Sequence, residues 1–251
     1  MDSSAVPDSF TLQIAQKNIA VSFPSELARK YCCSFITDQT PDFDLSVTDS
    51  DIEMERSLRC DFNLGRVRPL SSSQTALEMS ALLRALSNAL PEHGAFLIHG
   101  SAISYADQGL IFVAPSGTGK STYSLSWKTC FPEEVEYIND DKPFVGIRFN
   151  LPIVYGSPWR GKHGRGSNTS VPLKAICFIH RSEKNTVQKL SAVEALPLLV
   201  TSVHLPEEAS GKKAVFDIIS KLSKTVDYYS IGCNMDADAC IVAKETIYND
   251  A

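Results

Sequence analysis

The chain has 251 residues, of which 43% are hydrophobic and 21% are charged, and its formal net charge at pH 7 is -5. A chain of this length and hydrophobic content can bury one substantial core with a smaller appended lobe, so intrinsic disorder is not expected. The mild acidity gives no general attraction to nucleic acid or to an anionic membrane, so we expect neither as a partner.

The cysteines and the first residues indicate the compartment. The seven cysteines are odd in number and contain no C-x-x-C pair, which predicts neither a disulfide framework nor a zinc site and fits a reducing cytoplasm. Residues 1–7 are small and polar, and no apolar run approaches the ~20 residues that a membrane span requires. We therefore expect a soluble, cytoplasmic protein.

The N-terminal part of the chain alternates short strand-like runs with polar breaks. The pattern predicts a hairpin with its turn at residues 16–18, a short helix, a third strand and a loop rich in Ser and Pro, at residues 10–23, 25–35, 42–47 and 69–73. No ligand motif is evident there. We therefore predict a small, β-containing N-terminal α/β lobe over residues 1–90 and assign it no role.

Residues 74–90 carry apolar side chains at helical spacing, which predicts an amphipathic helix leading into a second domain. The residues of this stripe are Leu77, Met79, Leu82, Leu83, Leu86 and Leu90. A short apolar strand is predicted over residues 95–98, and a second one over residues 109–113 after a turn. Two adjacent strands are therefore expected before residue 114.

Residues 114–122 match the phosphate-binding P-loop pattern G-x-x-x-x-G-K-[ST] in all but the first position, which is Ala114. Such a loop directs backbone N–H groups at phosphate oxygens where a helix begins, predicted here over residues 121–129. Lys120 is expected to reach the β- and γ-phosphates, and the Ser121 hydroxyl to help hold Mg²⁺. The strand-loop-helix context disfavours the alternative of a turn that binds nothing. The predicted nucleotide-binding residues of the loop are Ser116, Gly117, Thr118, Gly119, Lys120, Ser121 and Thr122.

A predicted strand over residues 135–138 is followed by the acidic pair Asp140 and Asp141. At the end of a strand beyond a P-loop, a carboxylate can meet the Mg²⁺ ion and the γ-phosphate of a bound nucleotide. One carboxylate can hold the metal ion while the other deprotonates an acceptor hydroxyl. The alternative is a solvated turn or a helix cap, which this context disfavours.

A loop over residues 156–168 interleaves four glycines with Arg160, Lys162, His163 and Arg165. Backbone N–H groups and cationic side chains together suit an anion, and the alternative is a solvated basic loop. The remaining predicted elements are a strand, two helices, a strand and a final helix, at residues 174–180, 191–203, 212–225, 228–234 and 236–248.

The middle of the chain resembles the HPr kinase/phosphorylase family, which shares its nucleotide-binding core with ATP-dependent phosphoenolpyruvate carboxykinase. The family pattern runs strand, His-Gly, strand, S-G-x-G-K-S, helix, strand and Asp-Asp. It is matched in the same order by His99-Gly100, Ser116 to Ser121 and Asp140-Asp141. The resemblance covers residues 92–250. It implies an α/β fold with a P-loop core of this type, a mixed sheet and a nucleotide-binding catalytic domain over residues 91–251.

The resemblance also implies roles for single residues. Lys120 would bind phosphates, Ser121 would hold Mg²⁺, and Asp141 would be the base that activates an acceptor hydroxyl. His99 would lie beside them, and Asp140 would support the metal ion or a water molecule.

A second match to the family lies in the basic loop. Its Glu-Arg-Gly element is echoed by residues 159–161, so Arg160 carries over as a catalytic cation, whereas Trp159 stands in place of the acidic metal ligand. Smaller HPr-kinase-related proteins have a Pro-Trp-x-Gly-Lys stretch, matched by residues 158–162, which implies a nucleotide contact for Lys162. No Pro-Gly-Arg segment of the bifunctional enzymes is found near the end of the chain, which weakens HPr as a partner and phosphorolysis as a second activity.

The implied function is ATP-dependent transfer of the γ-phosphoryl group to a hydroxyl, with serine of a peptide, a protein or a small molecule as the acceptor. Two alternatives stay open. One is a nucleotide-binding regulatory module without turnover, and the other is an enzyme similar to phosphoenolpyruvate carboxykinase. The sequence leaves open whether ATP, ADP or pyrophosphate is the donor, and it leaves open the oligomeric state, a homo-oligomer included.

Overall fold

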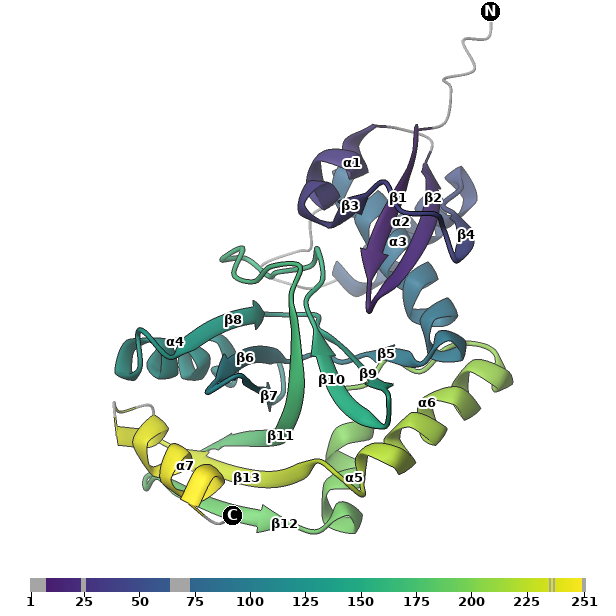
Figure 1. Ribbon diagram of the computed structural model, residues 1–251. Coiled ribbons are helices and arrows are strands. Elements are labelled where there is room, and N and C mark those ends of the chain that lie inside the picture. The colour runs from purple at the N-terminus through teal and green to yellow at the C-terminus, as the bar shows by residue number, and fades with distance from the viewer. Residues whose placement is uncertain (1–7, 24–25, 64–72, 235, 237, 250–251) are drawn as a thin grey trace, which may run out of the picture.

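The computed structural model describes residues 8–23, 26–63, 73–234, 236 and 238–249, and helices pack against two β-sheets (Figure 1). The smaller sheet comes from the N-terminal residues and the larger sheet from the rest of the chain. The predicted loop rich in Ser and Pro falls mainly on residues 69–72, outside the described residues. In the described ranges, none of the helices has the length and apolar character needed to span a membrane.

The small sheet has the strand order β3-β1-β2-β4. Its strands are β1 (Asp8–Ile14), β2 (Lys17–Phe23), β3 (Ile36–Thr37) and β4 (Phe43–Ser46). The predicted hairpin is confirmed, but its turn is tighter than expected. Ala15 and Gln16 both adopt positive φ angles, 50° and 61°, which close the turn directly between β1 and β2.

Three helices accompany this sheet: α1 (Leu27–Cys32), α2 (Asp49–Asn63) and α3 (Gln74–Ala89), and a 3₁₀ turn follows α1 at Cys33–Phe35. The first and third were predicted, but α2 was missed because most of its residues are polar or charged. A local signal was present in the sequence. Thr48 N–H donates to the Asp51 carboxylate at 2.8 Å, and Asp51 N–H donates to the Thr48 hydroxyl at 3.3 Å. This reciprocal pair begins the helix as a capping box.

The large sheet is mixed, as predicted, with nine strands in the described part of the chain. Its main path is β5-β9-β10-β11-β7-β6-β8, and β13 pairs with both β11 and β12. The contacts of β11 with β7 and β13 are parallel, and the other pairs are antiparallel. The strands are β5 (Ala95–Leu97), β6 (Ser101–Tyr105), β7 (Gln108–Val113), β8 (Val135–Asn139), β9 (Phe144–Arg148), β10 (Leu151–Tyr155), β11 (Ser170–Arg181), β12 (Thr186–Leu190) and β13 (Asp227–Cys233).

The two strands expected before residue 114 are β5 and β7, and they are not adjacent in the sheet. In the large sheet, strands β9, β10, β12 and β6 were not predicted. In the first two, Gly146 and Pro152 interrupt the apolar run, and both residue types weaken a strand pattern. The structure explains the glycine. A Cβ atom on Gly146 would lie 2.5 Å from the carbonyl oxygen of Gly94, so the close approach of β9 to the start of β5 requires this residue.

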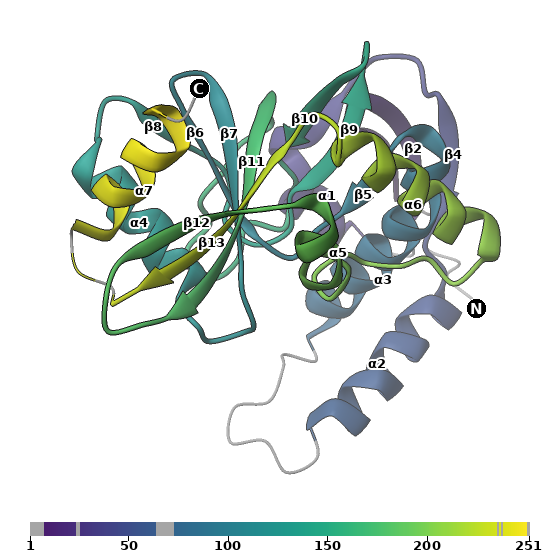
Figure 2. The ribbon, with the colours of Figure 1, turned by 90° about the horizontal axis from the view of Figure 1, so that it is seen from below.

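Helices cover both faces of the large sheet (Figure 2). On one side lie α4 (Lys120–Cys130) and α7 (Asp238–Asn249), and on the other α5 (Ala192–Val200) and α6 (Ala209–Leu222). Strand β7 contributes Leu110 and Phe112 to the first core and Ile111 and Val113 to the second. A strand buried on both faces reads as a continuous apolar run, which is why the sequence revealed it.

A third core joins the two sheets. It contains the inward residues of β1 and β2 and the buried face of α3, together with Leu97, Phe144, Tyr155 and Trp159 from the large-sheet part of the chain. The N-terminal lobe is therefore packed directly onto the region that carries the basic loop.

Candidate functional site

The residues that match the P-loop pattern, called the P-loop below, lie between the end of β7 and the start of α4 at Lys120, as the predicted strand-loop-helix order requires. Gly117 and Gly119 have φ angles of +81° and +120°, a backbone conformation that L side chains rarely adopt. Ala114, which replaces the first glycine of the pattern, is buried and is not among the described residues with positive φ. The added methyl group therefore causes no backbone strain.

Lys120 leads from this loop toward the acidic pair. Its Nζ donates a hydrogen bond to the Ala114 carbonyl oxygen at 2.8 Å. Burial lowers the pKa of Lys120 below its ordinary value of 10.5, and the charge of Lys142 lowers it further, while the charges of Asp141 and Asp140 act in the opposite sense. Lys120 begins α4, and Ser124 of the same helix donates a hydrogen bond to Asp140, so the end of the loop and the acidic pair belong to one region.

The turn that carries the two aspartates is held by Asn139, the last residue of β8. Its Oδ1 accepts hydrogen bonds from the backbone N–H groups of Asp141, at 2.9 Å, and Lys142, at 2.6 Å. Its Nδ2 donates to the carbonyl oxygen and the hydroxyl of Ser157, each at 3.0 Å. A fully buried amide thus fixes the direction of the acidic pair.

Asp140 points into the protein, with a side chain only 1% exposed. Its Oδ1 accepts hydrogen bonds from the Ser101 hydroxyl at 2.7 Å and from the Ser124 hydroxyl at 3.4 Å. Arg165 Nη1 lies 3.8 Å from its other oxygen. Because Ser124 belongs to α4, Asp140 ties the acidic turn to the helix that follows the P-loop.

Asp141 has a more open position, with one third of its side chain exposed. His99 Nε2 lies 3.4 Å from Asp141 Oδ1, and Lys142 Nζ lies 3.1 Å from the same oxygen. Burial alone would raise the pKa of Asp141, but the hydrogen bonds from His99 and Lys142 and their charges outweigh it, so the pKa falls below its ordinary value. At neutral pH this carboxyl is therefore an accessible carboxylate that can accept a proton.

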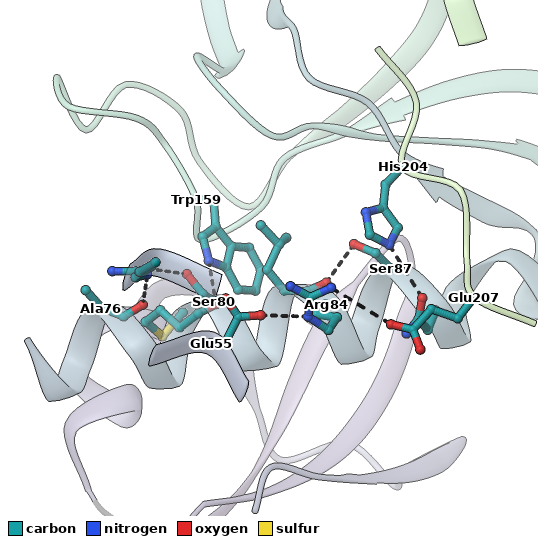
Figure 3. Close-up of polar contacts among 12 residues, drawn as sticks. Glu55, Ala76, Ser80, Arg84, Ser87, Trp159, His204 and Glu207 are labelled. Carbon is teal, nitrogen blue, oxygen red and sulfur yellow. Dashed lines mark hydrogen bonds and ion pairs between the residues drawn. The ribbon is translucent and has the colours of Figure 1, made fainter. Parts of the chain in front are cut away.

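The basic loop is anchored at Trp159 and then passes the acidic pair. The Trp159 side chain is buried, and its Nε1 donates to the Met79 carbonyl oxygen in α3 at 3.0 Å (Figure 3). Gly161 has a φ angle of +64°, and a Cβ atom there would lie 3.2 Å from Asp141 Cβ. Arg160 precedes this glycine in the chain, so its backbone lies near Asp141, and its Nη1 donates to the Gly166 carbonyl oxygen at 3.4 Å.

The predicted site residues fall into two groups. Lys120, His99, Asp140 and Asp141 converge, and Arg160 lies beside them. The other predicted nucleotide-binding residues are open to solvent. Ser116, Gly117, Thr122 and Lys162 are exposed, and Thr118, Gly119 and Ser121 are half-buried.

Four polar residues of the site were not assigned to it from the sequence: Ser101, Ser124, Lys142 and Arg165. Two of them carried a signal. Ser124 follows Lys120 by one helical turn and so lies on the same face of α4, and Lys142 follows the acidic pair directly. The sequence places Arg165 only among the cations of the basic loop. In the structure its guanidinium lies 5.3 Å from the Tyr137 ring centroid and 3.8 Å from Asp140.

Two cavities meet at His99. One, of about 530 Å³, is lined by the first P-loop residues together with Phe178, His180 and Leu198. The other, of about 370 Å³, lies between α3 and the large-sheet part of the chain, and Lys142 is also part of its wall. Both cavities thus open beside the partners of Asp141.

No protein-family model matches the sequence, and no curated protein matches it. Among solved structures, the chain is similar to the HPr(Ser) kinase/phosphatase from Coxiella burnetii, with 10% sequence identity and a TM-score of 0.36. The match covers 61% of this chain and 94% of that one. The likeness is a distant one of fold, so the argument for function rests on the residues of this chain.

Proposed function

We propose that this chain is an ATP-dependent phosphotransferase that moves the γ-phosphoryl group to a hydroxyl, with serine in a peptide, a protein or a small molecule as the acceptor class. One observation supports this most directly. The helix that begins at Lys120 is joined to the acidic turn by the hydrogen bond from Ser124 to Asp140, and the next residue, Asp141, is a carboxylate with one third of its side chain exposed. A phosphate grip beside a proton acceptor is what phosphoryl transfer needs.

The P-loop supplies the donor site. Its backbone N–H groups and the N-terminus of α4 favour the negative charge of a polyphosphate. On binding, Lys120 exchanges its hydrogen bond with the Ala114 carbonyl oxygen for phosphate oxygens, and Arg160 adds positive charge from the basic loop. These fixed charges stabilise the transferring group without reorganising during the step.

The residues fit a magnesium ion held mainly by the nucleotide. No cluster of three or more His, Cys, Asp or Glu side chains in the described part of the chain forms a complete metal site. Mg²⁺ in such proteins takes only one or two protein ligands and completes its shell with phosphate oxygens and water. Ser121 would supply a hydroxyl, and Asp140, locked by Ser101 and Ser124, would support a bound water. When bound, the ion neutralises phosphate charge.

Asp141 carries out the proton transfer in this proposal. Its carboxylate takes the proton of the acceptor hydroxyl as the acceptor oxygen bonds to the γ-phosphorus. The bond between that phosphorus and the β,γ-bridging oxygen breaks, and ADP leaves with the electron pair. His99 and Lys142 orient the carboxylate, so most of the rate comes from positioning and electrostatics.

A labelling experiment tests the proposal. The protein is incubated with Mg²⁺ and ATP labelled in the γ-phosphoryl group, together with serine peptides and small hydroxyl compounds. We expect label in a phosphomonoester, formed at least about 10²-fold more slowly by the Asp141→Asn variant. Parallel reactions with ADP and with pyrophosphate identify the donor.

The alternatives give different results in the same experiment. A regulatory module would bind ATP, detected by calorimetry, and leave it intact. An enzyme similar to phosphoenolpyruvate carboxykinase would place label in phosphoenolpyruvate only when oxaloacetate is added. Either result would contradict transfer to a hydroxyl.

A further inference from the structure

The 370 Å³ cavity is formed by both parts of the molecule. Helix α3 supplies Ser80, Leu83 and Arg84, and the large-sheet part supplies His99, Lys142 and His204. Figure 3 shows Arg84 with Glu55 on one side and Glu207 on the other, and His204 above α3. The N-terminal lobe, to which the sequence assigns no role, thus contributes a wall of this cavity.

The cavity adjoins the proposed base. His99 and Lys142 line it and also contact the same oxygen of Asp141, at 3.4 Å and 3.1 Å. A molecule in the cavity that extends a hydroxyl past His99 would bring it to the Asp141 carboxylate. The P-loop lies on the other side of His99, where its first residues line the second cavity.

The size of the cavity limits what can enter. Its volume of about 370 Å³ is near the lower end of the range for small-molecule sites, roughly 300–1,000 Å³. The surface of a folded protein is too large and too convex for such a space. A small molecule fits.

The polar groups of the wall indicate the chemistry of that molecule. Arg84 Nε donates to Glu55 Oε1 at 2.6 Å. Arg84 Nη1 lies 3.9 Å from Glu207 Oε1, which is beyond hydrogen-bond distance. A guanidinium has five N–H donors and an ammonium has three. Arg84 and Lys142 therefore keep donors for a ligand, while the Glu55 carboxylate of the wall is already paired. Because cationic donors are available in the wall and its own carboxylate is paired, the wall favours a ligand that carries a carboxylate.

We propose that this cavity binds the phosphoryl acceptor, and that the acceptor is a small hydroxy acid whose carboxylate pairs with Arg84 and Lys142. The inference rests on the proposed phosphotransferase function and names its substrate class. Arg84 and Leu83 are then specificity-determining residues, and the N-terminal lobe selects the acceptor while the P-loop holds the donor.

Matched compounds test the chemical class. Glycerate has a carboxylate where glycerol has a hydroxymethyl group, and L-serine and serinol differ in the same way. With γ-labelled ATP and Mg²⁺, we expect label in at least one of the two acids, with kcat/KM at least about tenfold above that of the matching alcohol, because a charge-assisted pair is lost. An alcohol that reacts as well as its acid would overturn the proposal.

The outcome separates the two proposals. Label in an internal serine of a peptide, with none in the four small compounds, rejects the acceptor cavity and keeps phosphotransfer to a hydroxyl. If ATP binds but label appears in neither the peptide nor the four small compounds, both proposals are contradicted.

Variants locate the binding site. Leu83→Trp fills the cavity, and Arg84→Lys keeps a positive charge opposite Glu55 while removing the planar fork. Each should raise KM for the acid about tenfold and leave ATP affinity, measured by calorimetry, unchanged. Leu196→Trp, on the exposed face of α5 and outside this cavity, should change neither value. If both cavity variants bind ATP normally and keep the wild-type KM, the acceptor binds elsewhere.

Discussion

The two sheets of the molecule differ in how they serve the site. Helices cover both faces of the large sheet, and the segments that follow β7 and β8 lead to Lys120 and the acidic turn. The small sheet buries one face, and its described strands make no hydrogen bond to the acidic turn. It acts at a distance instead, because α3, which packs with it, accepts the Trp159 hydrogen bond and lines the cavity proposed for the acceptor.

The two halves of the site differ in what specifies them, because one depends on a local motif and the other on contacts between distant parts of the chain. The proposed donor half is specified by a short motif, since the P-loop pattern needs only the strand before it and the helix after it. The proposed acceptor half is specified by packing between residues far apart in the chain, such as Met79 and Trp159. Substitutions in the two halves should therefore change different measured quantities.

The largest effect is expected from Lys120→Ala. The ammonium is half-buried beside the acidic pair, and its loss leaves Asp140 and Asp141 to repel the phosphates. We expect ATP binding to fall below detection in calorimetry and turnover to fall by about 10³-fold or more. Thermal unfolding should change little without nucleotide. Normal ATP affinity in this variant would show that the P-loop isn't the donor site.

Asp141→Asn should have the next largest effect, and on turnover alone. The amide keeps the shape of the carboxylate but cannot take a proton, so kcat should fall by at least about 10²-fold. ATP affinity should stay the same or increase, because a negative charge near the phosphates is removed. Single-turnover kinetics with excess enzyme measure the chemical step. A normal rate would remove Asp141 from the role of base.

The same division explains what could be predicted from the sequence. The strands of the large sheet that are buried on both faces and the amphipathic α3 follow from local apolar patterns, and the helix after the P-loop follows from the motif. The acidic pair could be placed because it follows such a strand. These elements need only their own residues and those next to them.

Other features depend on contacts that no local pattern carries. The role of Trp159 could not be seen, because it depends on α3, a helix far earlier in the chain. The burial of Asp140 depends on Ser101, Ser124 and Arg165, which come from three separate segments. Strand β9 was hidden by Gly146, whose close contact with Gly94 becomes clear only in the folded chain.

Trp159→Phe should separate stability from nucleotide binding. It removes the hydrogen bond to Met79 and part of a buried side chain, which should lower the free energy of unfolding by about 1–2 kcal/mol. Because this residue anchors the loop that carries Arg160, kcat should fall several-fold, while ATP affinity stays near wild type. Urea unfolding and steady-state kinetics measure these quantities. A loss of ATP affinity as large as that of Lys120→Ala would mean that the two halves are not independent.

The smallest effect is a dependence of ATP affinity on alkaline pH. Burial and the charge of Lys142 lower the pKa of Lys120 below 10.5, and a bound polyphosphate favours the protonated form. ATP affinity should therefore be highest well below that pKa and weaken as the pH rises through it. The loss should be about twofold at the pKa and approach tenfold per pH unit beyond it.

The terminal phosphate itself titrates near pH 6, about the second pKa of a phosphomonoester, and so contributes no slope in this range. Calorimetry from pH 7.5 up to pH 10.5, the ordinary pKa of a lysine, measures the trend. In Lys120→Arg the guanidinium keeps its charge, so this variant should bind ATP more weakly overall but with a flat profile, and an equal slope in both proteins would assign the titration to another group.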